Sequence, residues 1–255
     1  MCRSGALKLS VLIPARDEAG SIEATLAGLI TVLRREAIQH EIVVADDGST
    51  DATAAIVRRY ALSEPSVILA PVSGPHGYGH AVRAALARST GDAAAIMMAD
   101  GSDSAEDLVR YHRKLEEGFD CVFGSRFIAG SRVSGYPPHK LIINRLANWF
   151  IQILFGLRYN DVTNAFKAYR REVIEGMQPL ISPHFNLTVE MPLKAIVRGY
   201  SYAVIPISWE NRRTGISKLK LQEMGSRYLF IVLYLWLEKL LSRGDYRRKK
   251  CTTVF

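Results

Sequence analysis

Several features that define other classes of protein are missing from this sequence. The 255 residues include three cysteines, Cys2, Cys121 and Cys251, which are too few and too far apart for a disulfide framework or a zinc knuckle. No uncharged apolar run reaches the roughly 18 residues of a membrane-spanning helix, and the apolar stretch near the N-terminus is too short for a signal peptide. We therefore expect reduced thiols and a protein that stays on the cytoplasmic side.

Nucleic-acid-binding patterns are also absent, because the sequence has neither zinc-finger spacing nor a basic strand interleaved with aromatic residues. Lys and Arg nevertheless outnumber Asp and Glu by 33 to 25, which gives a net charge of +8. Part of this excess lies near the C-terminus, at Arg243, Arg247, Arg248, Lys249 and Lys250. The excess favours an anionic membrane surface or a phosphate-bearing substrate as partner and not a nucleic acid.

Short buried runs and helical patterns alternate through the first half of the chain. Continuous apolar runs predict strands over residues 9–14, 41–45, 67–70, 93–99 and 121–124. Apolar residues at helical spacing predict helices between them, over residues 22–33, 52–60, 80–88 and 105–117. This alternation with short connections is typical of an α/β fold with a Rossmann-like, doubly wound and mostly parallel sheet.

The second half carries longer apolar helical patterns. They predict helices over residues 140–155, 186–198 and 222–241. A strand is predicted over residues 202–209, and Pro206 restricts it to a sheet edge or a bulge because proline cannot donate a ladder hydrogen bond. The uncharged run 228–237 would span about 15 Å as a helix, half of a bilayer core.

Polar clusters follow four of the predicted strands, at residues 14–18, 46–51, 74–79 and 100–103. Each cluster alone is compatible with ordinary turn and helix-capping chemistry. The carboxyl ends of parallel strands, however, lie at one edge of the sheet, where α/β proteins bind their ligands. Together the four clusters predict a nucleotide pocket.

The usual phosphate-binding fingerprints are missing from this pocket. The first turn lacks G-x-G-x-x-G, which counts against a dehydrogenase, and no Gly-Lys-Ser/Thr of a P-loop is present. Carboxylates converge instead, an arrangement that is unfavourable beside phosphates unless a divalent cation lies between them. Asp100 and Asp103 are hard oxygen ligands of the kind Mg²⁺ or Mn²⁺ prefers, and such a metal neutralises a nucleotide leaving group.

Motifs in both halves carry a family resemblance. VLIPARDEAGSI, VVADDGSTDAT, GPHGYGHAVRAA and the Asp100 loop resemble the family 2 glycosyltransferases with the GT-A fold. GSRFIAG, HKLIINRLAN, NDVTNAFKAYRREV and residues 185–219 resemble one branch of them, the polyprenyl- or dolichyl-phosphate sugar synthases of the dolichol-phosphate mannose synthase type. The resemblance extends from about Leu9 to Leu219. It implies inverting transfer of a hexose from a GDP- or UDP-linked sugar to a polyprenyl phosphate.

For the donor side, the resemblance implies that Pro14, Ala15 and Glu18 border the base and ribose. Asp46 would hold the base or ribose edge, and Asp47 would buttress the loop. The donor set is completed by Gly79, Ala99 and Asp100, and Asp100 would be the principal metal ligand. Met98 stands where the family has the first Asp of Asp-x-Asp, and methionine does not hold Mg²⁺. Either Ser102 or Asp103 takes up coordination, or the metal site is weaker than is usual in the family.

For the acceptor side, arginine suits a lipid phosphate because it binds this anion bidentately. The resemblance implies phosphate contacts for Arg126, Lys140, Asn144, Arg145 and Lys218. A C-terminal loop with Arg212, Arg213 and Lys218 would close over the diphosphate, so that Asp100, Arg126 and Arg213 form the catalytic set. A phosphate monoester is already ionised, so it needs no strong base. Asp161 and Glu190 are secondary candidates, required as base only with a hydroxyl acceptor.

A polyprenyl chain stays in the bilayer, so the enzyme must approach the membrane. The helix over residues 140–155, with Trp149 and Phe150, and the C-terminal helix, with Tyr228, Tyr234 and Trp236, have the composition of interfacial segments. A core or dimer contact is the alternative interpretation of such stripes. The C-terminal basic residues would add attraction to an anionic surface. We expect a peripheral protein at the inner face of the membrane.

The expected organisation is a GT-A domain over residues 1–220 and an amphipathic helix with a basic tail over residues 221–255. Within the domain, residues 8–125 would form the nucleotide-sugar half and residues 126–220 the acceptor half. Two alternatives stay open: a glycosyltransferase with a saccharide or other hydroxyl acceptor, and a silent nucleotide-sugar-binding module. The identity of the sugar, the base, the lipid length, the metal and the oligomeric state are open as well.

Overall fold

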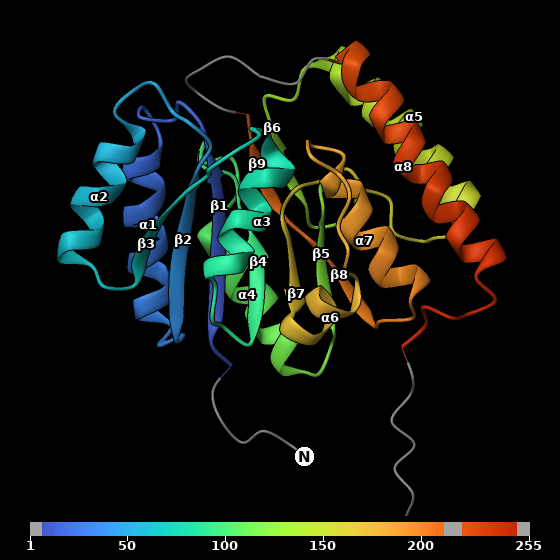
Figure 1. The fold of residues 1–255 in the computed structure, drawn as a ribbon, viewed down its shortest axis with the longest axis horizontal. Helices are drawn as coiled ribbons and strands as arrows, with labels where there is room; N and C mark the ends of the chain where they lie inside the picture. The colour runs from blue at the N-terminus through green and yellow to red at the C-terminus, as the bar shows by residue number, and fades with distance from the viewer. Residues whose placement is uncertain (1–6, 212–220, 249–255) are drawn as a thin grey trace, which may run out of the picture.

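The computed structural model describes residues 7–211 and 221–248 and is built around a seven-stranded sheet (Figure 1). From one edge to the other the strands are β3 (Val67–Pro71), β2 (His40–Asp46), β1 (Leu9–Ala15), β4 (Ala93–Ile96), β7 (Lys167–Arg170), β5 (Cys121–Ser125) and β8 (Tyr202–Pro206). Strand β7 runs antiparallel to β4 and β5, and all other neighbours are parallel. The predicted mostly parallel α/β sheet is confirmed.

Helices cover both faces of the sheet, as a doubly wound fold requires. Alternate side chains of β1 point to opposite faces, with Val11 and Ile13 on one and Leu12 on the other. The first face is covered by α1 (Ile22–Arg35), α2 (Thr53–Ser63) and α4 (Ala105–Glu116). The second is covered by α3 (Tyr78–Arg88), α5 (Pro138–Phe155), α6 (Arg171–Gly176), α7 (Leu187–Val197) and α8 (Leu221–Leu241).

Some details differ from the sequence-based expectation. The short strand β7 and the helix α6 were not predicted, and the fourth strand ends at Ile96 instead of residue 99. The strand predicted over residues 202–209 is divided at Ile207 into β8 and β9 (Ser208–Glu210), and β9 pairs with β6 (Arg132–Ser134) in a separate two-stranded sheet. Strand β8 lies at the sheet edge, as Pro206 predicted.

Helix α8 packs against α7 and also contacts α5 (Figure 1). Its buried residues Ile231, Val232 and Leu235 belong to the core on the second face of the sheet. Helix α5 begins at a proline, which suits the first turn. It ends before Gly156, whose positive φ of 67° favours glycine. Across residues 7–211 and 221–248, no helix combines the length and the apolar character needed to cross a membrane.

Candidate active site

The four polar clusters predicted at the strand ends meet at one edge of the sheet. The Asp17 N–H donates to Ser49 Oγ (3.0 Å), and the Thr50 N–H donates to Asp17 Oδ1 (2.7 Å), which joins the first cluster to the second. The Thr25 hydroxyl at the start of α1 donates to the Ala99 carbonyl (3.0 Å), directly before the fourth cluster. The chain therefore brings together loops that are up to about 80 residues apart in sequence.

The first cluster contains three of the predicted donor contacts. Pro14 and Ala15 are buried at the end of β1, and the Ala15 carbonyl accepts the N–H of Asp47 (2.8 Å). The Glu18 N–H donates to Thr53 Oγ1 (2.8 Å), which anchors this loop on the first turn of α2. These bonds hold the backbone of the first loop beside the second.

The two aspartates that end β2 have different surroundings. Asp47 is buried, and both of its carboxylate oxygens accept the N–H of Gly77, at 3.1 and 2.9 Å. Its Oδ1 also lies 3.1 Å from His76 Nδ1. Asp46 accepts only a longer bond from the Ser49 N–H, at 3.2 Å. The hydrogen bonds of Asp47 thus hold the third loop against the second.

Gly79, in the first turn of α3, has a structural reason to be glycine. Its N–H donates to the Pro183 carbonyl (2.9 Å), and a Cβ at this position would lie 2.2 Å from the Ser182 carbonyl oxygen. The amide is therefore used inside the protein, and the missing side chain lets residues 182–183 pack on the helix start. The predicted donor contact of Gly79 stays a prediction.

The loop after β4 holds the predicted metal ligands. Asp103 Oδ2 accepts the N–H of Met98 (3.0 Å), and Asp100 Oδ1 accepts the N–H of Ser102 (3.0 Å). Burial, with a further contribution from the charge on Asp100, raises the pKa of Asp103 to about 7. Met98 thus contributes its backbone to the loop and no ligand.

A divalent cation between Asp100 and Asp103 would stabilise the charged form of both carboxylates. Mg²⁺ is commonly held by one or two carboxylates and takes its other ligands from water and substrate phosphates. The residues present fit such a cation, which would neutralise a diphosphate. Within the described part of the chain, no three His, Cys, Asp or Glu side chains form a complete metal cage.

Arg126, the predicted acceptor contact after β5, is held by Asp161. Its backbone N–H (2.9 Å) and Nε (2.8 Å) donate to Asp161 Oδ2, and Nη2 donates to Oδ1 (2.7 Å). Although burial alone lowers it, the neighbouring carboxylate raises the pKa of Arg126 above its ordinary value. Three aromatic rings surround the guanidinium, with centroids 5.3–5.7 Å from Cζ: Phe127, Tyr136 and Trp209.

Residues 160–164 connect the predicted acceptor residues to one another. Besides the Asp161 pair with Arg126, the Asn144 amide donates to Thr163 Oγ1 (2.7 Å), and Arg145 Nη1 donates to the Asn160 carbonyl (3.4 Å). Lys140 lies one turn before Asn144 on the same helix. The segment therefore brings Arg126, Asn144 and Arg145 together, although the sequence shows no such link.

Neither Asp161 nor Glu190 is the spare carboxylate that sequence reasoning assumed. Asp161 is completely buried against Arg126. Glu190, also completely buried, pairs with Lys194 (2.8 Å) and accepts the N–H groups of Ile181 and Ser182. A hydroxyl acceptor would find no unpaired base in these two side chains.

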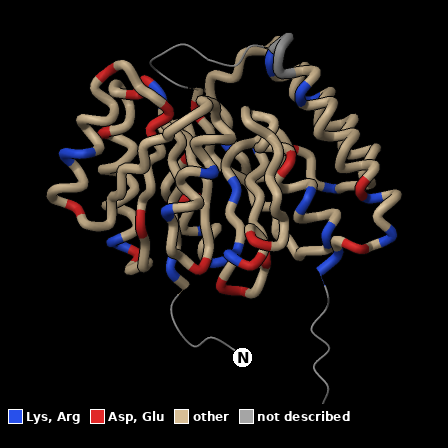
Figure 2. Tube along the Cα trace, viewed as in Figure 1, with Lys and Arg blue, Asp and Glu red and all other residues tan. Residues whose placement is uncertain are grey.

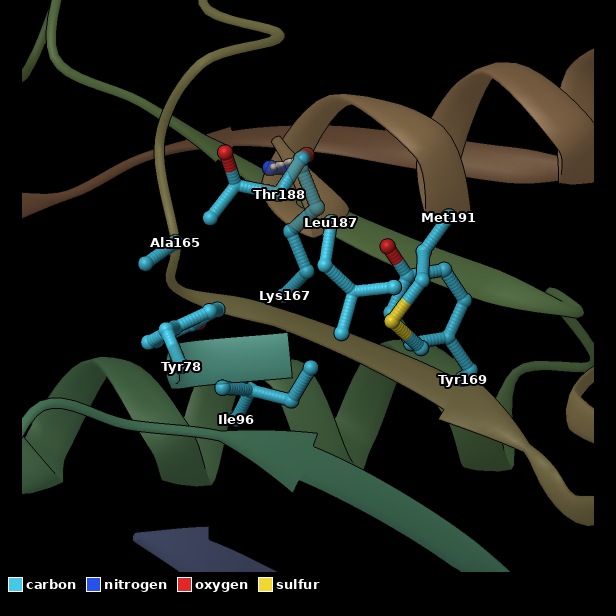
Figure 3. A pocket seen from close by; sticks show the side chains of 8 residues that line it. All are labelled: Tyr78, Ile96, Ala165, Lys167, Tyr169, Leu187, Thr188 and Met191. Carbon is cyan, nitrogen blue, oxygen red and sulfur yellow. Dashed lines mark hydrogen bonds between the residues drawn. The ribbon is translucent and has the colours of Figure 1, made fainter. Parts of the chain in front are cut away.

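Lys167 on β7 was not predicted as a site residue, although it lies in the stretch NDVTNAFKAYRREV that carries the family resemblance. Its Nζ donates to the carbonyls of Val162 (3.0 Å), Thr188 (3.1 Å) and Asn164, so it fastens residues 162–164 to the start of α7. Burial lowers the pKa of Lys167 to about 7. It lines a small pocket (Figure 3) together with Tyr78, Ile96, Ala165, Tyr169, Leu187, Thr188 and Met191.

The predicted closing loop cannot be compared with this geometry. Arg212, Arg213 and Lys218 lie in residues 212–220, outside the described residues. Their predicted roles stay predictions.

A doubly wound sheet with an acidic loop after its fourth strand is the architecture of GT-A glycosyltransferases. Glucosyl-3-phosphoglycerate synthase from Mycobacterium tuberculosis, solved with UDP, superposes with a TM-score of 0.67 at 19% identity, covering 91% of this chain and 80% of that one. The same enzyme with Mg²⁺ and UDP gives a TM-score of 0.66 at 17% identity, with 96% and 81% covered. These similarities establish the fold.

The glycosyl transferase family 2 model matches residues 10–177, and the chain belongs to this family. It is therefore a glycosyltransferase. Polyprenol monophosphomannose synthase of Mycolicibacterium smegmatis is 30% identical over 215 residues, 82% of this chain and 80% of that protein. Undecaprenyl-phosphate mannosyltransferase of Micrococcus luteus is 27% identical over 220 residues, 84% and 88% of the two chains.

Proposed function

We propose that this glycosyltransferase moves a hexose, with inversion, from a nucleoside diphosphate sugar to a polyprenyl phosphate at a membrane surface. The observation that carries the proposal is the convergence of Arg126, Asn144 and Arg145 on residues 160–164, at the same edge of the sheet as the Asp100 loop. Two relatives, whose names refer to polyprenol and undecaprenyl phosphate, support it.

The acceptor chemistry suits this set of residues. Asp161 takes two of the five N–H donors of the Arg126 guanidinium, so donors remain for a phosphate. A phosphate monoester attacks as an anion and gives up no proton in the step, which agrees with the absence of an unpaired base at Asp161 and Glu190. Catalysis then depends on positioning and on neutralising the departing diphosphate.

On the donor side, we propose that Asp100, with Asp103 or Ser102, holds Mg²⁺ or Mn²⁺ against the diphosphate. Pro14, Ala15, Glu18 and Asp46 would border a GDP or UDP moiety. In support, a solved neighbour of the same fold was crystallised with UDP and either metal. The metal would supply charge neutralisation for the leaving group.

An exposed apolar surface supports the membrane part of the proposal. It runs over the neighbouring helices α5 and α8 (Figure 1) and consists of Ile142, Leu146, Trp149, Phe150, Ile153, Leu229, Phe230, Leu233, Leu237, Leu240 and Leu241. The middle of α8 carries no charged residue (Figure 2). Exposed apolar side chains on two neighbouring helices are typical of interfacial helices. We propose that it rests in the inner leaflet, the cytoplasmic face.

Arg248, one of the basic residues of the predicted membrane-binding tail, forms ion pairs within the protein. Arg248 Nη1 lies 2.8 Å from Asp120 Oδ2, and Nη2 lies 3.4 Å from Glu172 Oε1, so its charge is satisfied within the protein. Lys249 and Lys250 lie outside the described residues.

The acceptor assignment is tested with purified protein in detergent, Mn²⁺, and GDP-mannose or UDP-glucose. We expect labelled sugar to appear on polyprenyl phosphate and not on the matching polyprenyl alcohol, which lacks the anion. Extension of a free saccharide without any sugar lipid would overturn the assignment in favour of a hydroxyl acceptor.

The membrane contact is tested by flotation with anionic vesicles. Ile153→Glu places a charge on the apolar surface, where the side chain is 63% exposed, and should reduce vesicle binding. The matched control is Leu62→Glu on α2, at the other side of the molecule, where the side chain is 90% exposed (Figure 1). Equal vesicle binding by both variants would argue against this surface.

A further inference from the structure

Strand β9 lies directly against the predicted metal loop. Asp103 and Trp209 form an antiparallel β-bridge, and the Glu210 N–H donates to the Ser102 carbonyl (3.2 Å). On its other side β9 pairs with β6, where Trp209 lies opposite Val133. Backbone pairing therefore sets the position of Trp209 beside the Asp100–Asp103 loop.

From Trp209 a row of aromatic rings leads toward the acceptor cations. The ring centroids of Trp209 and Tyr136 are 4.9 Å apart, and those of Tyr136 and Phe127 are 6.4 Å apart. At the far end of the row, Arg145 Cζ lies 4.6 Å from the centroid of Phe127. All three rings keep part of their surface exposed, whereas the Arg126 side chain beneath them is only 8% exposed.

The charge of Arg126 does not by itself account for these rings. Asp161 already neutralises the guanidinium through two short hydrogen bonds, at 2.8 and 2.7 Å. A partly exposed Trp–Tyr pair beside a site for sugar transfer is, in contrast, suited to binding an apolar face, because aromatic rings bury large areas with little loss of conformational entropy.

The reaction geometry indicates what that face belongs to. In the proposed function, on which this inference rests, an acceptor phosphate oxygen forms a bond to the anomeric carbon while the bond to the diphosphate oxygen breaks. The leaving oxygen takes the electron pair, and no proton moves. Inversion requires the two oxygens to lie on opposite sides of that carbon. The sugar ring is therefore between the Asp100 loop and Arg126, where the aromatic row runs.

We propose that Trp209 and Tyr136 form the platform on which the C–H face of the donor hexose packs, and that they help to select the sugar. Trp209 is next to the metal loop, so it meets the sugar near the diphosphate. Tyr136 continues the platform toward the acceptor side. The nucleoside part of the donor lies beyond the reach of this pair, at the ends of β1 and β2.

The distinguishing measurement compares nucleotides with and without the hexose. By calorimetry with Mn²⁺, Trp209→Ala should weaken GDP-mannose or UDP-glucose binding about three- to tenfold, and leave GDP or UDP binding unchanged. Trp209→Phe keeps a ring and should lose less. Tyr136→Leu should repeat the selective loss, and Tyr136→Phe, which keeps the ring, should retain affinity.

A fluorescence readout reports on Trp209 directly. The chain has three tryptophans, so a Trp149→Phe/Trp236→Phe protein leaves Trp209 as the single reporter. We expect its emission to change more with GDP-mannose or UDP-glucose than with the corresponding diphosphate. Unfolding temperatures measured for every variant identify any variant that is misfolded, and Trp209→Phe and Tyr136→Leu test the platform if Trp209→Ala does not fold.

The binding measurements distinguish failure of the platform from failure of the proposed function. Equal loss of the diphosphate and the sugar nucleotide, or no loss of either, would overturn the platform and leave the proposed function standing. Absence of any nucleotide binding by the unmodified protein would overturn both proposals. A selective loss of the hexose-bearing nucleotide supports the platform.

Discussion

Replacing Asp161 by asparagine should destabilise the fold and disable the acceptor side at the same time. The carboxylate is completely buried and accepts three hydrogen bonds from Arg126, at 2.9, 2.8 and 2.7 Å. Removing one partner of a buried ion pair costs about 3–5 kcal/mol, because the remaining charge stays uncompensated in the interior. Asparagine keeps one acceptor oxygen and nearly the same volume, so we expect the lower end, about 3 kcal/mol.

The free energy of unfolding is measured by urea titration at pH 7, followed by circular dichroism and extrapolated to zero denaturant. Glu106→Gln is the matched control. It also breaks an Arg–carboxylate pair, with Arg35 at 2.7 Å, but the two side chains are 53% and 58% exposed. Solvent screens this pair, so its loss should leave the unfolding midpoint almost unchanged.

A second variant separates stability from activity. Arg126→Met combined with Asp161→Leu removes both charges, and apolar replacement of a buried pair often restores stability. We expect this protein to recover much of the stability lost in Asp161→Asn, and to remain inactive because the cation that we propose for the acceptor phosphate is gone. The reasoning is refuted if Asp161→Asn unfolds at the same urea concentration as Glu106→Gln.

Three further predictions concern the metal, the pH dependence and the packing of α3. Asp100→Ala should lower metal-dependent turnover about 100-fold or more, and normal turnover would disprove the metal site. Burial raises the pKa of Glu41, but its hydrogen bonds, of which the one from Lys8 has the largest effect, lower the pKa to about 2. Its contribution of about 3 kcal/mol is complete above the ordinary pKa of 4.5 and is lost as the pH falls toward 2. The difference in urea midpoint between wild type and Glu41→Gln should therefore shrink as the pH falls through that window. Gly79→Ala would place Cβ 2.2 Å from a backbone oxygen and should cost about 1–3 kcal/mol. Gly28→Ala on α1, with nothing within 4 Å, should be tolerated, and equal melting temperatures for the two would contradict this account.

The sequence alone determined the architecture and the edge of the sheet that carries the site. Continuous apolar runs such as residues 9–14 are typical of a strand covered on both faces, and their alternation with amphipathic helices is typical of a parallel sheet. Because parallel strands end at one edge, the loops at residues 46–51 and 100–103 had to lie near each other. Pro206 likewise restricted its strand to an edge.

Only the tertiary structure decided which charges meet. Asp161 and Arg126 are 35 residues apart, and nothing in local propensity or periodicity marks them as partners. Strand β7 has only four residues, with a charged residue at each end, and exists because β4 and β5 supply hydrogen-bonding partners on both sides. Long-range pairing of this kind is not encoded in any single window of sequence.

The sequence shows the type of each residue, but the role of a residue depends on its neighbours in the fold. The carboxylates predicted a divalent metal and the arginines an anionic ligand, since these side chains have such uses beside a phosphate, whereas the transferase activity was implied by the family resemblance. Whether each charge is available depends on its neighbours. Burial beside Arg126 converts Asp161 from a possible base into an ion-pair partner, and the Asp120 carboxylate takes Arg248 away from the basic tail. Charge and hydrogen-bonding capacity belong to the amino acid, whereas desolvation and pairing arise only when the chain has folded.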